Sequence, residues 1–543
     1  MAAGEATDTG DSDRSHSGRR DRAREDAGTT TIAPETNDVP GPLDRNERRQ
    51  LALVRRFGTT GALLLAFAAV GAGAAPVDNP ISGIRVLSLP ARMPTVAMAC
   101  AWLGMLMVVI GWLWLGRLAL PGRSRLVSHT QLGRTIVMWG FPLAIAPPLF
   151  SRDMYAYLAQ SAVAASGADP YEFGPSEALG VDNPLTGNVP NIWRDTPAPY
   201  GPLFLMLGRG IAAIVGENIV FGVLLWRVVM LLSLALAVWA IPHLARRCGV
   251  PPVCALWLCA ANPIVLFHVV SGMHNEALLM GLMLAGIELG LRLPRPVGLV
   301  VGSVVIVVAG AVKPPAFIAL GFLGMYLARR RGGRLTDVLL VAAAMVAVFL
   351  ATMTVITVTS GWGLGWLETF DVPNRIKTWL APMTAVGMFG GGGVSMLLRL
   401  GNHTDAMLSI TKVIGYGISA LVCLRLLWTS FRGRIEPLTG LGITLGAVAL
   451  LGPVLHPWYL LWALAPLAVS TNDSRFRVVT IAISASVALL VPPTGAGYVL
   501  RYYMIPFAVI AALIAFAAIL LLTRGRVPRL LPNLRQPATT DSR

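Results

Sequence analysis

Long apolar runs, separated by short polar segments, fill the chain between about residues 51 and 525. A helix needs about 20 apolar residues to cross a bilayer, and fewer where Pro or Gly interrupts it. The pattern therefore predicts an all-α polytopic membrane protein with roughly 13–15 transmembrane helices, outer-face loops and interfacial helices. We expect the spans near residues 57–75, 95–116, 135–150, 219–241, 252–270, 275–293, 297–311, 315–328, 335–358, 405–428, 437–455, 458–470, 477–492 and 504–522.

The polar stretch from Ser151 to Asn218 is the longest interruption between apolar runs. Within it, residues 153–165 carry apolar side chains at helical spacing, which predicts a helix lying along the membrane surface. Residues 1–50 have no apolar face, so we expect a disordered cytoplasmic segment there. This division leaves a transmembrane domain at 51–525, with a large outer loop at about 151–218, and a cytoplasmic tail at 526–543.

Composition agrees with a membrane protein: 55% of the residues are hydrophobic and only 13% are charged. Soluble proteins carry about 25% charged residues. The net charge of +16 comes largely from Arg in short loops, which the positive-inside rule explains better than nucleic-acid binding does. Placing these loops in the cytoplasm puts both termini inside, and a multi-pass chain of this kind belongs in the plasma membrane. Five Cys without a CxxC pair argue against a disulfide frame or a zinc site.

One carboxylate, Asp153, belongs to the run Ser151-Arg152-Asp153, which directly follows an apolar segment that ends in Pro147-Pro148-Leu149-Phe150. Ionisable groups at the edge of a membrane are costly to place and commonly functional, which makes Asp153 a catalytic candidate. The alternative is structural: an Asp that caps the start of a helix where the span ends.

Other polar and aromatic residues fall in the segments that this topology places outside. His274-Asn275-Glu276 stands at a span entrance and favours hydrogen bonding to a polar substrate over metal binding, since further ligands are missing nearby. Lys313 precedes two prolines and is either snorkelling or binding an anion. The remaining outer candidates are Arg194, Asp195, Tyr200, Arg375, Lys377, His456, Trp458 and Arg501.

Motifs of several other activities are missing from the sequence. It contains no Walker A motif, no GxSxG and no HExxH. It also has no cytoplasmic domain that could bind a nucleotide sugar. If the chain is an enzyme, its activated substrate must reach the outer face already attached to a carrier, and a lipid is the obvious one.

These residues resemble the C-type glycosyltransferase superfamily, and more closely the B type of the actinobacterial alpha-(1→6)-mannosyltransferases of lipomannan synthesis. The resemblance covers nearly everything after the N-terminal segment. It rests on Ala91–Val96, Ser151-Arg152-Asp153 with Tyr155 and Tyr157, Ala168–Tyr171, Asn183-Pro184, Ile192–Pro202, His274–Glu276 and His456–Tyr459.

The resemblance implies a decaprenyl-phosphate mannose donor, a mannosylated lipid acceptor and an alpha-(1→6) product in the core of lipomannan and lipoarabinomannan. It implies inversion, with Asp153 as general base. Many relatives in the superfamily show paired acids at the first loop, whereas Arg152 precedes Asp153 here; no cofactor is expected, and a divalent metal is left open. Candidate donor-phosphate ligands are Lys313, Arg375, Lys377 and Arg501. Candidate sugar or acceptor ligands are Arg152, Tyr155, Arg194, Asp195, Tyr200, His274, Glu276, His456 and Trp458.

Two other functions compete with this prediction. The chain could be a glycosyltransferase that uses another lipid-linked sugar or another acceptor. It could also be a transporter of a lipid-linked sugar, which broken helices and charges near the membrane centre would suit. An inverted repeat is not evident in the sequence, and its polar groups lie toward the surface, so the transporter is the weaker alternative.

Overall fold

A computed structural model describes residues 41–370, 372–494 and 503–523. Over these ranges the regular structure is helical, and the predicted all-α class is confirmed. The predicted tail at 526–543 and most of the predicted disordered segment lie outside the described residues. The first half contains α1 (Arg45–Ala72), α2 (Leu89–Arg92), α3 (Pro94–Ala119), α4 (His129–Ile145), α5 (Asp153–Ser166), α6 (Pro175–Leu179), α7 (Pro184–Asn188), α8 (Asn191–Arg194), α9 (Pro202–Val215), α10 (Ile219–Arg247), α11 (Pro252–Cys259) and α12 (Glu276–Arg292).

The second half contains α13 (Val297–Gly310), α14 (Ile318–Arg331), α15 (Leu335–Ser360), α16 (Val372–Arg375), α17 (Pro382–Met388), α18 (Ser395–Leu397), α19 (Thr404–Phe431), α20 (Pro437–Leu451), α21 (Leu460–Ser470), α22 (Ser474–Leu490) and α23 (Met504–Leu522). Tighter or wider turns adjoin some of them: the π-helical η1 (Val265–Ser271) and η4 (Phe389–Val394), and the 3-10 helices η2 (Pro314–Phe317), η3 (Gly365–Phe370) and η5 (Pro457–Tyr459).

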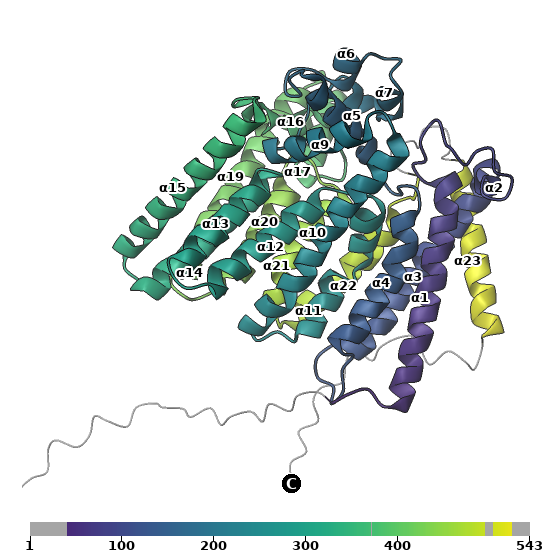
Figure 1. The fold of residues 1–543 in the computed structure, drawn as a ribbon, viewed down its shortest axis with the longest axis horizontal. Helices are drawn as coiled ribbons and strands as arrows, with labels where there is room; N and C mark the ends of the chain where they lie inside the picture. The colour runs from purple at the N-terminus through teal and green to yellow at the C-terminus, as the bar shows by residue number, and fades with distance from the viewer. Residues whose placement is uncertain (1–40, 371, 495–502, 524–543) are drawn as a thin grey trace, which may run out of the picture.

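The long helices lie side by side between two ends of the molecule (Figure 1). Among the described helices, six are long and apolar enough to cross a membrane, namely α1, α3, α10, α15, α19 and α23. Four shorter helices or helical segments are also apolar, namely Pro202–Val215, Val297–Gly310, Pro437–Leu451 and Pro457–Ser470. The short helices α5, α6, α7 and α9 gather at the upper end of the view, where the predicted outer loop folds over the bundle (Figure 1).

Glycines allow α1 and α3 to pack closely against each other. A Cβ atom on Gly61 would lie 2.8 Å from the carbonyl oxygen of Gly104, and one on Gly104 would lie 2.6 Å from that of Gly61. Small residues that let two helices approach to backbone contact are typical of membrane bundles. A side chain at either position would force the two helices apart.

The start of α1 corrects one prediction. We expected a span from about residue 57 after a disordered segment to residue 50, but α1 begins at Arg45. The Asp44 side chain accepts the Glu47 N–H at 2.8 Å, and the Glu47 side chain accepts the Asp44 N–H at 3.0 Å. This capping box satisfies two backbone donors at the helix start and extends the helix beyond its apolar part.

Proline interrupts one predicted span, 252–270, and stands just before two others, 315–328 and 458–470. Pro263 separates α11 from η1, while Pro314 and Pro457 begin the 3-10 turns η2 and η5. Proline removes a backbone donor and cannot continue a helix interior, so each break leaves irregular backbone near a polar segment. The helix predicted at 153–165 is present as α5, and most of its residues are buried within the protein; its placement along the membrane surface stays a prediction.

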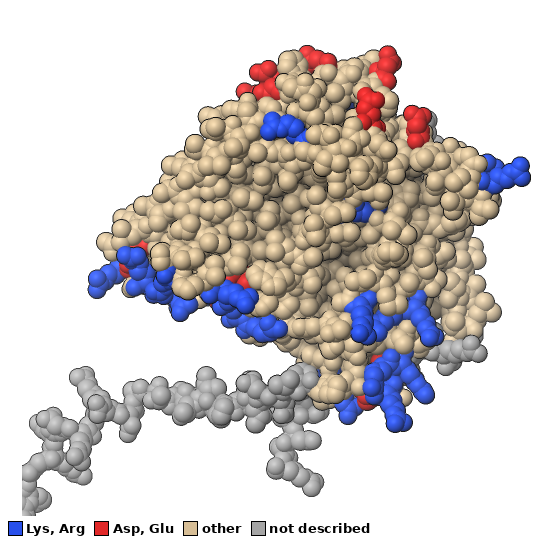
Figure 2. All heavy atoms as spheres, viewed as in Figure 1, with Lys and Arg blue, Asp and Glu red and all other residues tan. Residues whose placement is uncertain are grey.

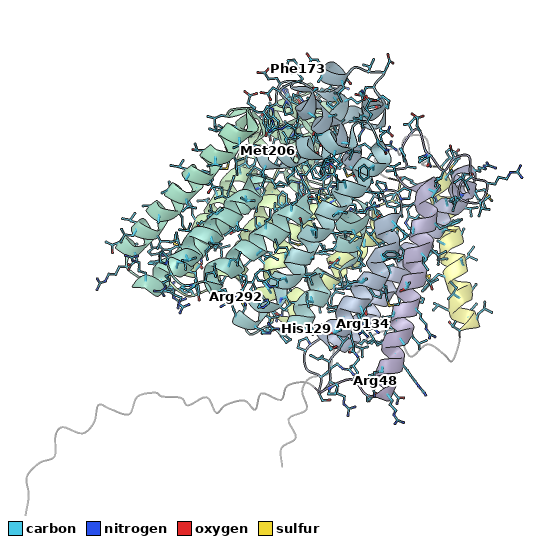
Figure 3. All side chains as sticks on the ribbon, in the orientation of Figure 1. Arg48, His129, Arg134, Phe173, Met206 and Arg292 are labelled. Carbon is cyan, nitrogen blue, oxygen red and sulfur yellow. The ribbon has the colours of Figure 1, made fainter. Side chains whose placement is uncertain are left out.

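Charge is distributed unequally between the two ends. Lys and Arg gather along the lower edge of the displayed face, and Asp and Glu gather at its upper edge (Figure 2). Side chains labelled at the lower end are Arg48, His129, Arg134 and Arg292, and Phe173 lies at the upper end, with Met206 below it (Figure 3).

Candidate active site

Asp153 is the first helical residue of α5, and Arg152 holds the N-cap position. The alternative interpretation of Asp153 as a helix cap is therefore wrong. The Asp153 N–H donates to the Ser151 hydroxyl at 3.0 Å. Phe150, just before this segment, has φ 68°, a left-handed conformation that is unfavourable for a residue with a side chain. Its N–H donates to the Pro493 carbonyl at 3.1 Å, and its ring stacks on Phe267 at 4.9 Å.

A second segment, His274-Asn275-Glu276, also follows a residue with a left-handed backbone conformation. It follows η1, and Met273 directly before it has φ 56°. Backbone strain of this kind costs about 1–3 kcal/mol per residue and tends to occur at functional sites. Both segments that carry candidate acids thus start from a strained residue.

The Lys313 ammonium contacts both the His274-Asn275-Glu276 segment and the aromatic residues Tyr459 and Trp462. It pairs with Glu276 and donates to the Asn275 side-chain oxygen at 3.2 Å. It also lies 4.7 Å from the ring centroid of Tyr459 and 5.6 Å from that of Trp462. Burial alone disfavours a charged amine, but the fields of Glu276, Tyr459 and Asp153 together raise the pKa of Lys313. Lys313 therefore stays charged.

A cavity of about 360 Å³ opens between these segments and the second half of the chain. Asp153, Lys313 and His456 supply its charged and polar groups, while valine, isoleucine and proline side chains form an apolar wall opposite the aromatic rings. Its lining residues are Asp153, Tyr157, Trp193, Pro199, Tyr200, Lys313, Pro314, Pro315, Val372, Ile376, Tyr416, Val448, Gly452, Pro453, Val454, His456, Trp458, Tyr459 and Trp462.

Burial raises the pKa of Asp153 from 3.8 to about 6. A hydrogen bond from Ser151 and the charge of Lys313 oppose this rise, and the carboxylate of Glu276 adds to it. A carboxylate with a pKa near neutrality is ionised at physiological pH and still accepts a proton readily, which suits a general base.

The ring of Trp458 lies between two imidazoles. His274 stacks on it at 3.5 Å with 18° between the planes, and His456 stacks at 4.6 Å with 9°. Both faces of the indole are therefore occupied, and only its edge reaches the cavity. Burial and Lys313 lower the pKa of His456 to about 4, so this imidazole is neutral.

Three of the predicted sugar ligands donate hydrogen bonds to backbone carbonyls. Arg152 donates to the carbonyls of Ala75 and Asn188, both at 3.3 Å, and the Tyr155 hydroxyl donates to the Ala74 carbonyl. Arg194 donates to the carbonyls of Val189 and Gly187, both at 2.9 Å, and Asp195 is exposed outside the cavity lining. These groups hold the outer loop over the bundle.

The other predicted residues separate into cavity and non-cavity groups. Tyr200, Lys313, His456 and Trp458 line the cavity with Asp153, whereas His274 and Glu276 lie behind its wall. Lys377 pairs with Asp405 at 2.8 Å on the exposed surface. The side chain of Arg375 and the whole of Arg501 lie outside the described part of the structure.

Five aromatic residues of the lining were not among the predicted ligands: Tyr157, Trp193, Tyr416, Tyr459 and Trp462. Tyr459 and Trp462 are three residues apart, a spacing that places two side chains on one helical face. This spacing in the sequence could have identified Trp462 as a neighbour of the predicted His456-Pro457-Trp458-Tyr459 segment.

Metal binding has little support among the side chains present. The described residues contain no group of three or more His, Cys, Asp or Glu arranged to hold a metal ion. Glu276, the other carboxylate whose field reaches Asp153, is already paired with Lys313.

The fold and the cavity define a helical membrane protein with a pocket that brings an acid and a cation together. Comparison with known sequences identifies its family. The family described as "Alpha-(1->6)-mannopyranosyltransferase, N-terminal domain" matches residues 55–329, and the family described as "MptB C-terminal domain" matches residues 383–521. The chain belongs to this family of membrane mannosyltransferases.

Individual members of this family are similar to the chain over most of their length. A probable alpha-(1→6)-mannopyranosyltransferase of Mycolicibacterium smegmatis is 44% identical over 90% of this chain and 91% of its own. An alpha-(1→6)-mannopyranosyltransferase of Mycobacterium tuberculosis is 42% identical over 90% of both chains. The alpha-(1→6)-mannopyranosyltransferase B of Corynebacterium glutamicum is 38% identical over 86% of this chain and 81% of its own. No solved structure matches the chain.

Proposed function

We propose that this chain transfers mannose from decaprenyl-phosphate mannose, or a similar polyprenyl-phosphate donor, to a mannosylated lipid. The product is an alpha-(1→6) link in the mannan core of lipomannan and lipoarabinomannan. The observation that carries the proposal is the meeting of Asp153 and Lys313 in one cavity. Asp153 supplies a base of suitable pKa, and Lys313 supplies a positive charge that can bind a phosphate.

The cavity suits a donor with a charged head and an apolar tail. Lys313 has donors directed to Glu276 and Asn275, and its ammonium also lines the cavity. A leaving phosphate gains negative charge in the transition state, and a fixed cation stabilises that charge. Val372, Ile376 and Val448 offer an apolar surface for the first isoprene units.

The chemistry follows from the donor. A beta-linked phospho-sugar that yields an alpha-glycoside reacts with inversion, so one base and one stabilised leaving group suffice. The Asp153 carboxylate takes the proton of the acceptor 6-hydroxyl as that oxygen bonds to the anomeric carbon. The bond from this carbon to the phosphate oxygen breaks, and its electron pair leaves on the phosphate beside Lys313. Tyr200, His456 and Tyr459 are the groups best placed to orient the sugars.

The orientation of the chain follows from its charged ends. Positively charged loops remain in the cytoplasm, so the lower end of Figure 2 faces inward. The cavity then opens on the outer face of the plasma membrane, where a flipped lipid-linked mannose is accessible and nucleotide sugars are not. Both termini are cytoplasmic in this arrangement.

The experiment uses membranes that contain the full chain or its Asp153→Asn variant. Radiolabelled polyprenyl-phosphate mannose and a short alpha-(1→6)-mannoside are supplied, with GDP-mannose as the control donor and EDTA in a parallel sample. We expect extended product from the polyprenyl donor with the wild type alone, in the presence or absence of EDTA. Normal transfer by Asp153→Asn would refute the base, and transfer from GDP-mannose without a lipid intermediate would refute the donor.

A further inference from the structure

A buried imidazole stands directly behind the proposed base. The Nδ1 atom of His274 lies 3.7 Å from Oδ2 of Asp153, and the His274 side chain is almost wholly buried. His274 is not part of the cavity lining, so it does not reach a substrate. Any effect of this residue on the reaction must pass through another group, and Asp153 is the group that it faces.

The position of the His274 ring is tightly constrained. Trp458 covers one face at 3.5 Å, and the ring of His268 lies 5.9 Å away at a tilt of 47°. The backbone N–H of His274 donates to the backbone carbonyl of His268 at 3.1 Å. A Cβ atom on Gly272 would lie 3.2 Å from the imidazole, so there is little free space on that side either. The ring cannot turn away from Asp153 without disturbing several neighbours.

The imidazole still has hydrogen-bonding capacity to spare. Within the described residues, neither ring nitrogen of His274 has a hydrogen-bond partner. A buried polar atom without a partner costs free energy, so such atoms tend to serve a function or to gain a partner in another state. The carboxylate at 3.7 Å is slightly beyond hydrogen-bond distance, and catalytic contacts of this kind often tighten only when substrate binds.

Charge limits the form in which His274 can act. Burial, His268, Lys313 and His456 together hold the pKa of His274 well below its ordinary value, so the ring is neutral. A neutral imidazole carries one N–H, and a carboxylate repels a bare ring nitrogen, so the tautomer with hydrogen on Nδ1 is favoured beside Asp153. The ring then donates to the carboxylate and keeps its own proton throughout the reaction.

We propose that His274 is a positioning residue, whose Nδ1–H orients the Asp153 carboxylate so that its other oxygen faces the acceptor hydroxyl. This inference rests on Asp153 being the base. It gives Trp458 a defined task as well: the indole holds the imidazole in place and does not stack on a sugar. The titratable groups that act on Asp153 or lie beside it are Lys313, Glu276, Tyr157, Tyr200, Tyr459 and His274.

The test compares two substitutions of His274 in the full chain. His274→Phe keeps the ring and its stack on Trp458 but removes the N–H donor. His274→Asn retains an N–H close to the Nδ1 position. We expect His274→Phe to lower kcat by about tenfold to a hundredfold, as losing an outer-shell orienting group commonly does, with little change in KM. The acid limb of its pH profile should move to higher pH, because the carboxylate has lost a donor. His274→Asn should recover much of the rate.

His268→Phe is the matched control, because His268 is equally buried and its ring lies next to that of His274, but it is not among the groups that shift the pKa of Asp153. It should leave the acid limb in place. A normal kcat in His274→Phe would overturn the proposal, as would a lower kcat with an unmoved acid limb and no recovery in His274→Asn. Asp153→Asn is measured beside them. Its failure to transfer together with a normal His274→Phe refutes the role of His274 alone, whereas normal transfer by Asp153→Asn refutes the base itself.

Discussion

Replacing Ser151 with Ala should shift the acid limb of the pH–rate profile toward higher pH. The Ser151 hydroxyl accepts the Asp153 backbone N–H at 3.0 Å. A separate hydrogen bond between the Ser151 hydroxyl and the Asp153 carboxylate lowers the pKa of that carboxylate, which burial raises to about 6. A hydrogen bond to a charged group contributes about 1.5 kcal/mol, which corresponds to about one pKa unit. Without this bond, the pKa of Asp153 should therefore approach about 7.

The size of the effect depends on pH. With a pKa of about 6, roughly 90% of the wild-type base is ionised at pH 7 and roughly 10% at pH 5, so the wild-type rate should fall about tenfold between them. With a pKa near 7, about half of the Ser151→Ala base is ionised at pH 7 and about 1% at pH 5. The variant should be about twofold slower than wild type at pH 7 and about tenfold slower at pH 5.

The assay measures kcat/KM for mannose transfer from a labelled polyprenyl donor between pH 5 and 8. Ser166→Ala is the control, because Ser166 ends α5, the helix that Asp153 begins, is exposed and donates its hydroxyl to the Val163 carbonyl. Its profile should superimpose on that of the wild type. An unmoved limb in Ser151→Ala, or a limb moved to lower pH, would refute either the assignment of Asp153 or the role of its hydrogen bond.

The same electrostatics lead to two further expectations. Asp153 binds its proton more tightly in the folded chain, since its pKa rises from 3.8 to about 6, so the ionised carboxylate destabilises the fold increasingly as pH rises through that interval. At pH 7 in detergent, Asp153→Asn should therefore have a free energy of unfolding up to about 3 kcal/mol higher than that of the wild type, and a higher unfolding temperature. The difference in stability should narrow below pH 6, and equal stability at pH 7 would contradict this prediction. Neutralising the ion pair in Lys313→Gln/Glu276→Gln avoids leaving a buried, unpaired Glu276 and should lower kcat/KM for the donor at least about tenfold; an unchanged kcat/KM would exclude Lys313 as the phosphate ligand.

The positions of the helices were largely predictable, and the points of disagreement have local causes. Apolar runs predicted spans such as α10 and α23, because burial in lipid requires continuous apolar sequence. The early start of α1 was missed because its first turn is polar and is held by the Asp44 and Glu47 caps. The break between α11 and η1 was missed because Pro263 lies within an otherwise apolar run.

The candidate site was predicted as separate segments. Asp153, His274, Lys313 and His456 were identified because polar groups at the ends of apolar spans are costly and stand out in the sequence. Their roles were less predictable. Arg194 looked like a sugar ligand, yet its guanidinium is used by the carbonyls of Val189 and Gly187. The sequence does not distinguish a charged side chain that faces a substrate from one that binds the backbone of its own loop.

The sequence by itself determined the membrane class, the approximate helix boundaries and the segments that hold reactive groups, because all three follow from local hydropathy and residue type. The tertiary structure decided which of these groups meet. Residues 153, 274, 313 and 456 come from four distant segments, and only the packing of their helices brings Asp153 beside Lys313 and His274. It also decided the chemistry of Asp153, since a pKa depends on burial and on charges that are neighbours in space and not along the chain.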